Sequence, residues 1–123
     1  MKIAVPAEKP EMGSGLSAVF GRCPYFMIVE VAAGKVAGSE AVSNPGINQA
    51  GGAGTAAAQE IGNLGVEALV AGTVGPKAFA ALETLGIDVY ESIGGSVQQN
   101  VDAFLSGNLL KANPKKHSGL FKK

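Results

Sequence analysis

Residues 50–59 read AGGAGTAAAQ, and the rest of the chain is arranged around this stretch. A glycine-rich turn here leads directly into a helix built of alanine. Glycine permits backbone angles that other residues avoid. The first amides of a helix have no internal partner, and the helix dipole adds partial positive charge beside them. The stretch is therefore either a tight connection that packs the helix close to a sheet or a cradle for an anion. Because it matches no complete phosphate-binding pattern, the tight connection is slightly favoured.

The composition predicts one soluble domain with a substantial core. The chain has 123 residues, 46% of them hydrophobic and only 16% charged, and its net charge is zero. Zero net charge gives no general reason to expect binding to nucleic acid or to a membrane surface. The single cysteine, Cys23, excludes an internal disulfide and suits a reducing compartment. The longest apolar run, residues 25–29, cannot span a bilayer, and residues 1–6 do not form a signal peptide. We therefore expect a cytoplasmic protein.

Apolar runs bounded by glycine and proline predict five strands. The first is short and is expected to stop at Pro6, and a long loop over residues 7–19 follows. The second is almost continuously apolar, which is typical of a strand covered on both faces. A turn at Ala33-Gly34 joins it to a more polar strand, as expected of an exposed hairpin partner. The predicted strands are residues 3–5, 25–31, 35–43, 66–71 and 87–90.

Helical periodicity and end signals predict three helices. The first begins after the glycine-rich turn and stops at Gly65. The second opens at Pro76 and closes at Gly86, the usual asymmetry of helix ends. The third starts at Ser96, and Gln99 completes a capping box. The apolar face of the second helix is predicted to consist of Ala78, Phe79, Leu82 and Leu85.

The order of these elements predicts an α/β fold. The hairpin favours antiparallel pairing, and the alternating helices and strands that follow favour parallel crossovers. We expect a mixed five-stranded sheet flanked by three helices. Residues 1–107 would form the domain, and residues 108–123 a basic, flexible C-terminal tail.

Three segments are candidates for a binding site. Ligands of such sheets bind beyond the carboxyl ends of the parallel strands. The loop over residues 72–75 and the turn before the first helix fit that position, and both lead into a helix N-terminus. The third segment is residues 20–24, where Arg22 suits an anion and Cys23 is the only good soft-metal ligand. Alternatively, Arg22 bonds a loop carbonyl and Cys23 is a small buried hydrophobic residue, which is the favoured interpretation for Cys23 alone.

Catalytic machinery is not evident in the sequence. His117 is the only histidine, and it falls in the tail. There is no Cys-x-x-Cys motif and no phosphate-binding lysine–serine signature. The carboxylates are spread along the chain without an obvious pair. An enzyme acting on a phosphorylated ligand or nucleotide through the glycine loops lacks a general base. These observations favour a binding protein that is not an enzyme.

Several short motifs, in this order and spacing, resemble the dinitrogenase iron–molybdenum cofactor biosynthesis family. This family includes nitrogenase cofactor accessory proteins and the molybdenum–copper orange protein. The resemblance covers residues 1–107. The motifs are MKIAVP at 1–6, FGRCPYF at 20–26, Asn44-Pro45, GGAG at 51–54, Gly72 with GPKAF at 75–79, and the helix at 96–107.

The resemblance implies a ribonuclease-H-like fold and a non-enzymatic carrier or assembly scaffold for an anionic metal–sulfur cluster. The cluster would be of iron–sulfur, molybdenum–iron or molybdenum–copper sulfide type, and the partners would be metallocluster assembly or acceptor proteins. Val19 and Ala50 stand where many members have histidine, so a cluster would be held by Cys23 or by amides and positive charge. The alternative is a protein–protein interaction module without a bound cluster, with Leu16, Val19, Phe20 and the tail as contacts. The implied cluster-binding residues are Phe20, Gly21, Arg22, Cys23, Gly51, Gly52, Ala53, Gly54, Gly72, Thr73, Gly75 and Lys77, with Cys23 as metal ligand.

Overall fold

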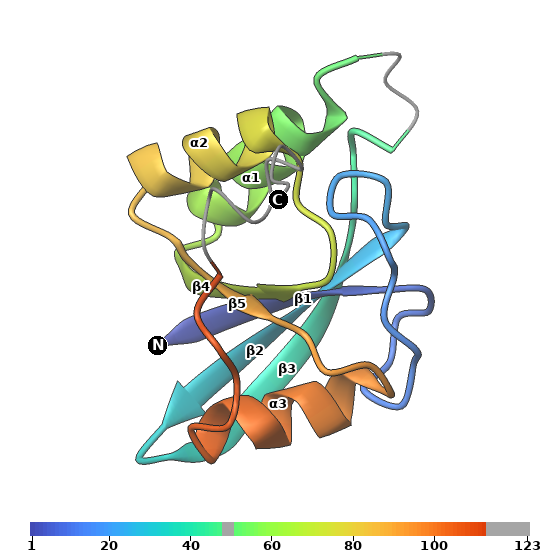
Figure 1. Cartoon of the computed structure of the whole chain (residues 1–123). Coiled ribbons are helices and arrows are strands. Elements are labelled where there is room, and N and C mark those ends of the chain that lie inside the picture. Colours follow the sequence, from blue (N-terminus) through green and yellow to red (C-terminus); the bar gives the residue numbers. More distant parts are fainter. Residues whose placement is uncertain (48–50, 113–123) are drawn as a thin grey trace.

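The computed structural model describes residues 1–47 and 51–112, and this part of the chain forms five strands and three helices (Figure 1). The number and type of elements confirm the prediction. The strands are β1 (Lys2–Ala7), β2 (Tyr25–Ala32), β3 (Lys35–Ser43), β4 (Val66–Ala71) and β5 (Asp88–Glu91). The helices are α1 (Ala53–Asn63), α2 (Pro76–Thr84) and α3 (Val97–Leu105).

The strands form one mixed sheet in the order β3-β2-β1-β4-β5. The β1–β2 and β2–β3 pairs are antiparallel, whereas β1–β4 and β4–β5 are parallel. The β2–β3 hairpin turns at Ala33 and Gly34, whose φ angles of 55° and 75° lie in the left-handed region that two-residue hairpins require. Parallel neighbours need a crossover, which α2 supplies between β4 and β5. The predicted mixed α/β sheet is confirmed, and the likeness to ribonuclease H stays a prediction.

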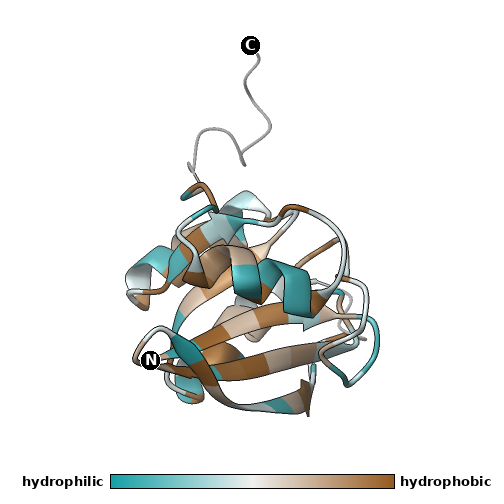
Figure 2. Ribbon diagram, turned by 90° about the horizontal axis from the view of Figure 1, so that it is seen from below, coloured by the Kyte–Doolittle hydropathy of each residue, from teal (hydrophilic) through white to brown (hydrophobic). Residues whose placement is uncertain are grey.

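Helices cover both faces of the sheet and divide the core into two layers. In Figure 1, α1 and α2 lie on one face and α3 lies on the other. Buried side chains of α1 and α2, such as Ile61 and Leu82, pack on Leu69 of β4. On the opposite face, Val97 and Val101 of α3 pack on β1 and β2. Figure 2 shows the resulting apolar strands between the helices.

Several details differ from the sequence prediction, and two of them concern Pro6 and Leu85. First, β1 continues through Pro6 to Ala7, and Pro6 pairs with Phe26 of β2. Pairing of β1 with β4 covers only Lys2–Ala4, so Pro6 has just one neighbouring strand and its missing N–H is tolerated. Second, Leu85 is 38% exposed, because α2 ends at Thr84 and Leu85 is its C-cap.

No helix in residues 1–47 and 51–112 is long and apolar enough to cross a membrane.

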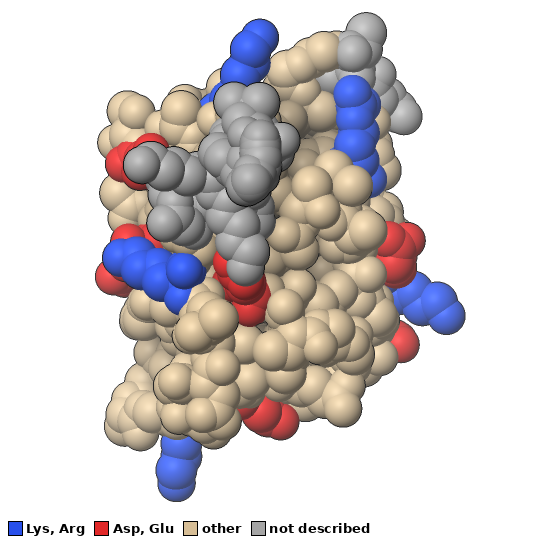
Figure 3. All heavy atoms as spheres, in the orientation of Figure 1, with Lys and Arg blue, Asp and Glu red and all other residues tan. Residues whose placement is uncertain are grey.

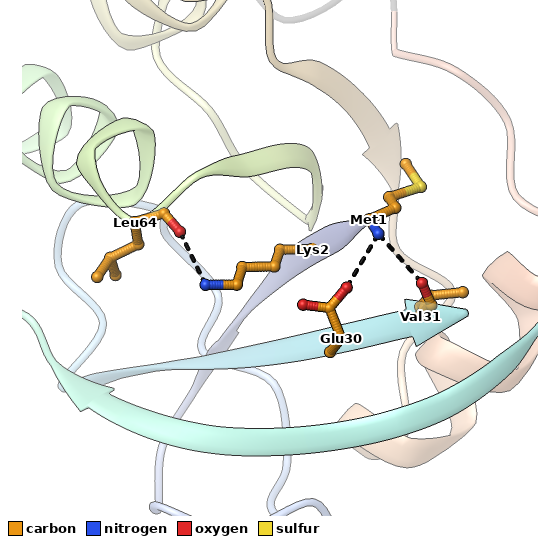
Figure 4. A network of polar contacts seen from close by, with 5 residues as sticks. All are labelled: Met1, Lys2, Glu30, Val31 and Leu64. Carbon is orange, nitrogen blue, oxygen red and sulfur yellow. Dashed lines mark hydrogen bonds and ion pairs between the residues drawn. The ribbon is translucent and has the colours of Figure 1, made fainter.

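The start of β1 is tied to β2 and to the C-terminal end of α1 (Figure 4). The amino group of Met1 donates to Glu30 Oε2 at 2.9 Å and to the carbonyl of Val31 at 3.1 Å. Lys2 Nζ donates to the carbonyl of Leu64 at 3.3 Å, at the C-terminal end of α1. A cation at this end complements the helix dipole. The Met1 bonds therefore tie the start of β1 to β2, and the Lys2 bond ties it to the end of α1.

The segment after α3 does not leave the domain at residue 108, in contrast to the predicted flexible tail. Glu91 N donates to the Leu110 carbonyl at 2.8 Å, and Ala112 N donates to the Val89 carbonyl at 2.7 Å. The side chain of Leu109 is buried in the α3 layer of the core. Residues 108–112 therefore cover the free edge of β5. Residues 113–123, including His117, lie outside the described residues.

Candidate binding site

A pocket of about 400 Å³ lies at the carboxyl end of β4, between the first turns of α1 and α2. The loop before β2 contributes Val19, Phe20 and Arg22. The start of α1 contributes residues 52–55, and the start of α2 contributes residues 75–78. The pocket thus brings together seven of the predicted site residues: Phe20, Arg22, Gly52, Ala53, Gly54, Gly75 and Lys77.

Small residues join the three walls of the pocket at close range. Gly21 has a φ of 99°, and a Cβ on it would lie 2.8 Å from Gly54 Cα. A Cβ on Gly54 would in turn lie 2.8 Å from the Cβ of Ala78 in α2. Real Cβ atoms do not approach backbone or side chains this closely, so both glycines are required by packing. The close packing at Gly54 is therefore with the Gly21 turn and with α2, whereas the sequence predicted a tight connection to the sheet.

Both helices present free amides to the pocket. Gly52, with a φ of 75°, precedes α1, and Gly75 precedes α2. The first intrahelical bonds run from Ala56 N to the Gly52 carbonyl and from Phe79 N to the Gly75 carbonyl, both at 2.9 Å. Neither helix has a side-chain cap among the residues with defined positions. The positive ends of two helix dipoles therefore meet at one cavity.

Positive side chains flank this cavity. Arg22 and Lys77 are exposed and line the pocket, and no carboxylate is among its lining residues in the described chain. Nη1 of Arg22 donates to the Ile47 carbonyl at 3.2 Å. Elsewhere charges of both signs are spread over the visible surface, as Figure 3 shows, in keeping with the zero net charge. The pocket is thus locally positive on a neutral protein.

The thiol of Cys23 lies outside the pocket lining. Cys23 is fully buried. Burial raises the pKa of the Cys23 thiol from 9.0 to about 12, and hydrogen bonds from the backbone of Gly21 and Cys23 and from the Asn44 side chain oppose this rise only in part. The thiolate is the form that binds metals and acts as a nucleophile, so this environment disfavours both. The arrangement matches the alternative in which Cys23 is a small buried residue.

Among the remaining predicted residues, Gly72 and Thr73 support the pocket without lining it. Phe20 N donates to the Thr73 carbonyl at 3.0 Å, and Thr73 N donates to the Ala18 carbonyl at 3.1 Å. A Cβ on Gly72 would lie 3.3 Å from the Ala18 carbonyl oxygen. Residues 72–73 therefore hold the Phe20 loop in place. Gly51 is exposed and is not part of the lining, and Ala50 lies outside the described residues.

One buried residue of the site was interpreted from the sequence only as part of a turn. Asn44 is 3% exposed, and its Nδ2 donates to the carbonyls of Gly21 and Cys23 at 3.0 and 2.9 Å. Its Oδ1 accepts from Gly46 N at 3.0 Å. The only sequence signal was the Asn44-Pro45 pair within the family resemblance.

A conventional metal site is absent from the described part of the chain. No group of three or more histidine, cysteine, aspartate or glutamate side chains is close enough there to hold a metal ion. The pocket can instead offer backbone N–H groups and two cationic side chains. Such donors bind anions rather than bare cations.

The family model for the dinitrogenase iron–molybdenum cofactor matches residues 1–107. The chain belongs to this family. Membership confirms the resemblance inferred from the motifs and associates the chain with proteins of iron–molybdenum cofactor biosynthesis or metallocluster binding.

Several relatives share most of the chain. An uncharacterized protein of Methanocaldococcus jannaschii is 40% identical over 111 residues, which cover 90% of this chain and 91% of that protein. The apo form of the orange protein from Desulfovibrio gigas has a TM-score of 0.84 and 37% identity, covering 90% of this chain and 92% of the other. A NifB-like protein from Thermotoga has a TM-score of 0.77 and 34% identity, covering 99% and 97%. These matches confirm the fold over nearly the whole domain.

Proposed function

We propose that the protein is a non-enzymatic carrier or assembly scaffold for an anionic metal–sulfur cluster, which binds in the pocket between α1 and α2. The observation that carries this proposal is Gly75. Its φ and ψ of −66° and 162° suit any residue, and a Cβ there would meet nothing within 4 Å. Neither strain nor packing therefore requires glycine at this helix start. Because Gly75 lines the pocket, we propose that the absence of a side chain there leaves room for a ligand beside the first amides of α2.

The donors at the pocket suit a sulfide-bridged polyanion. Cluster sulfides accept hydrogen bonds from the amides at the start of α1 and α2, and Arg22 and Lys77 balance the negative charge. Iron–sulfur, molybdenum–iron and molybdenum–copper sulfide clusters all meet this description. Retention by charge and hydrogen bonds leaves the cargo free to be handed on, as a carrier requires.

Ligation by Cys23 is the other way in which the cluster would be held. It requires the thiol to leave its buried position and to lose a proton, against a pKa raised by burial to about 12. The pocket already supplies donors that need no such rearrangement. We therefore propose that backbone amides and cationic side chains hold the cluster, with ligation by Cys23 as the alternative.

Delivery of a cluster implies assembly or acceptor proteins as partners, in a reducing cytoplasm. Val19, at the edge of the pocket, is 42% exposed and is available for such a contact. Phe20 is 3% exposed, and Leu16 is only partly exposed, so these two offer less surface than Val19. An interaction module without cargo is the second candidate function. Partner capture that persists after removal of all metal would favour it.

Anaerobic reconstitution tests the first function. Protein incubated with iron and sulfide, or with tetrathiomolybdate and copper, is desalted and analysed for metal and for visible absorption. We expect a stoichiometric coloured complex with wild-type protein and with Gly13→Ser, since Gly13 is exposed and also has open space at its Cβ. Gly75→Ser should fold normally and retain little metal. Absence of bound metal in the wild type under both conditions would refute the proposal.

A further inference from the structure

Asn44 has the contacts of a residue that holds another in position. Nδ2 of Asn44 donates to the carbonyls of Gly21 and Cys23, the residues on either side of Arg22. Gly21 and Cys23 are buried, whereas Arg22 between them is exposed. The amide therefore fixes the backbone on both sides of Arg22, the cationic residue that this turn contributes to the pocket.

Asn44 also fixes the acceptor of the Arg22 side chain. Its Oδ1 accepts from Gly46 N at 3.0 Å, and its carbonyl accepts from Ile47 N at 3.4 Å. The carbonyl of Ile47 in turn accepts from Arg22 Nη1 at 3.2 Å. Asn44, the Arg22 turn and the turn at residues 44–47 thus form a closed ring of hydrogen bonds. The Asn44 side chain thus bonds the backbone on both sides of Arg22 and also the turn whose Ile47 carbonyl accepts from the Arg22 guanidinium.

We propose that Asn44 is a positioning residue that orients the Arg22 guanidinium at the mouth of the pocket for an incoming anion. This inference rests on the proposed function for its ligand, but the orientation itself is a property of the protein alone. A guanidinium held in place loses less conformational freedom on binding than a mobile one. Asn44 acts through Arg22 and need not touch the ligand.

The chain contains a matched control in Asn100 of α3. Asn100 is fully buried, and its Nδ2 donates to the carbonyls of Gly94 and Ser96 at 2.8 and 2.9 Å. Its Oδ1 accepts from Ile93 N at 2.8 Å. From α3, on the opposite face of the sheet, it therefore makes the same types of bond to backbone groups of the loop that precedes this helix. Asn100→Ala reports the general effect of losing such a residue.

The first test uses the protein without any ligand. The heteronuclear NOE of the Arg22 Nε–Hε group is measured by NMR in wild type, Asn44→Ala and Asn100→Ala. We expect a high NOE, typical of a rigid group, in wild type and in Asn100→Ala. The NOE should be clearly lower in Asn44→Ala. If Asn44→Ala does not fold, Asn44→Ser, which keeps a shorter donor, replaces it. An unchanged NOE in a folded Asn44 variant would overturn the inference, whether or not the protein binds a cluster.

The second test is a double-mutant cycle with tetrathiomolybdate as the probe. Asn44→Ala should weaken binding about tenfold, the lower end of what loss of a supporting residue costs a metal site. In the Arg22→Ala background the same change should alter affinity by less than about twofold, because its effect passes through Arg22. An equal loss in both backgrounds would mean that Asn44 only stabilises the fold. If wild type does not bind this probe, the NOE alone decides the positioning role, and the reconstitution with iron and sulfide or with tetrathiomolybdate and copper decides the proposed function.

Discussion

Gly21 and Gly54 are in direct backbone contact, and this contact joins the Arg22 turn to the first turn of α1. A Cβ on Gly21 would lie 2.8 Å from Gly54 Cα and 2.9 Å from Gly54 N. The neighbour of Gly54 on its other side is Ala78 of α2. The separation of the three walls of the pocket is therefore set by residues that have almost no side chain.

Alanine at either glycine should destabilise the protein. Gly21→Ala combines a left-handed φ with a clash against backbone, and Gly54→Ala clashes with the Cβ of Ala78. Overpacking of this kind costs about 1–3 kcal/mol of unfolding free energy. Gly13→Ala, with neither feature, should change stability by less than about 1 kcal/mol. Urea unfolding with an unchanged m-value is the measurement.

A rescue variant distinguishes this clash from a general effect of alanine. Ala78→Gly removes the atom that a Cβ on Gly54 would meet. By itself it should cost about 0.5–1 kcal/mol, as glycine does inside a helix. Combined with Gly54→Ala it should be less destabilising than the sum of the two. Simple additivity of the two changes would show that the close contact does not limit stability.

Much of the fold around this contact could be predicted because glycine and proline mark the ends of its elements. The predicted bounds of residues 35–43 and 66–71 are those of β3 and β4. Pro76 and the Ser96–Gln99 capping box correctly placed the starts of α2 and α3. These signals are local, since each depends on the dihedral preferences or hydrogen bonds of a few neighbouring residues.

What the sequence did not predict depends on contacts between distant segments. Asn44 reads as a turn residue before proline, and nothing nearby indicates that its amide reaches carbonyls 23 and 21 positions away. Leu85 has the right spacing for the buried face of α2, but it caps the helix and lies beside Gly62 of α1. The position of the strand ends led us to expect that the turn before α1 and the loop before α2 lie close together. Burial was the favoured interpretation for Cys23 alone, whereas the family resemblance implied that it is a metal ligand.

The buried thiol of Cys23 should affect stability at high pH. Its pKa is about 12 in the folded protein against 9.0 for an exposed cysteine. Between these two pH values the Cys23 thiol therefore stays protonated in the native state, whereas it is deprotonated in the unfolded state. The unfolded state binds fewer protons, so stability is complete below pH 9 and falls as pH rises, by about 1.4 kcal/mol per pH unit.

The effect of Cys23 can be isolated by difference. Stability of wild type and of Cys23→Ala is measured by urea unfolding from pH 8 to 11, and the difference between the two curves removes the shared titration of lysine and tyrosine. The wild-type curve should have the steeper decline above pH 9. In the native state the thiol should also resist alkylation at pH 8. Rapid labelling of native protein, or parallel curves, would contradict the buried environment.

Arg22 should contribute more to cluster uptake than Cys23. The guanidinium lines the pocket, whereas the thiol does not. Arg22→Ala should therefore lower the amount of retained metal more than Cys23→Ser, and added salt should weaken binding by screening the charges. Lys35→Ala, at an exposed position on β3, is the control for loss of one positive charge. The reverse ranking, with binding insensitive to salt, would indicate ligation by the thiolate.

Residues 108–112 should contribute to the stability of the domain, although the sequence assigned them to a flexible tail. Leu109 and Leu110 are adjacent, but their exposed fractions are 9% and 70%. Leu109 packs in the core layer on the α3 side of the sheet, so Leu109→Ala should cost about 2–3 kcal/mol of unfolding free energy. Leu110→Ala should change it by no more than about 0.5 kcal/mol, since only its backbone carbonyl bonds to β5. Urea unfolding of the pair provides the comparison, and equal effects of the two substitutions would show that this segment does not pack on the domain in solution.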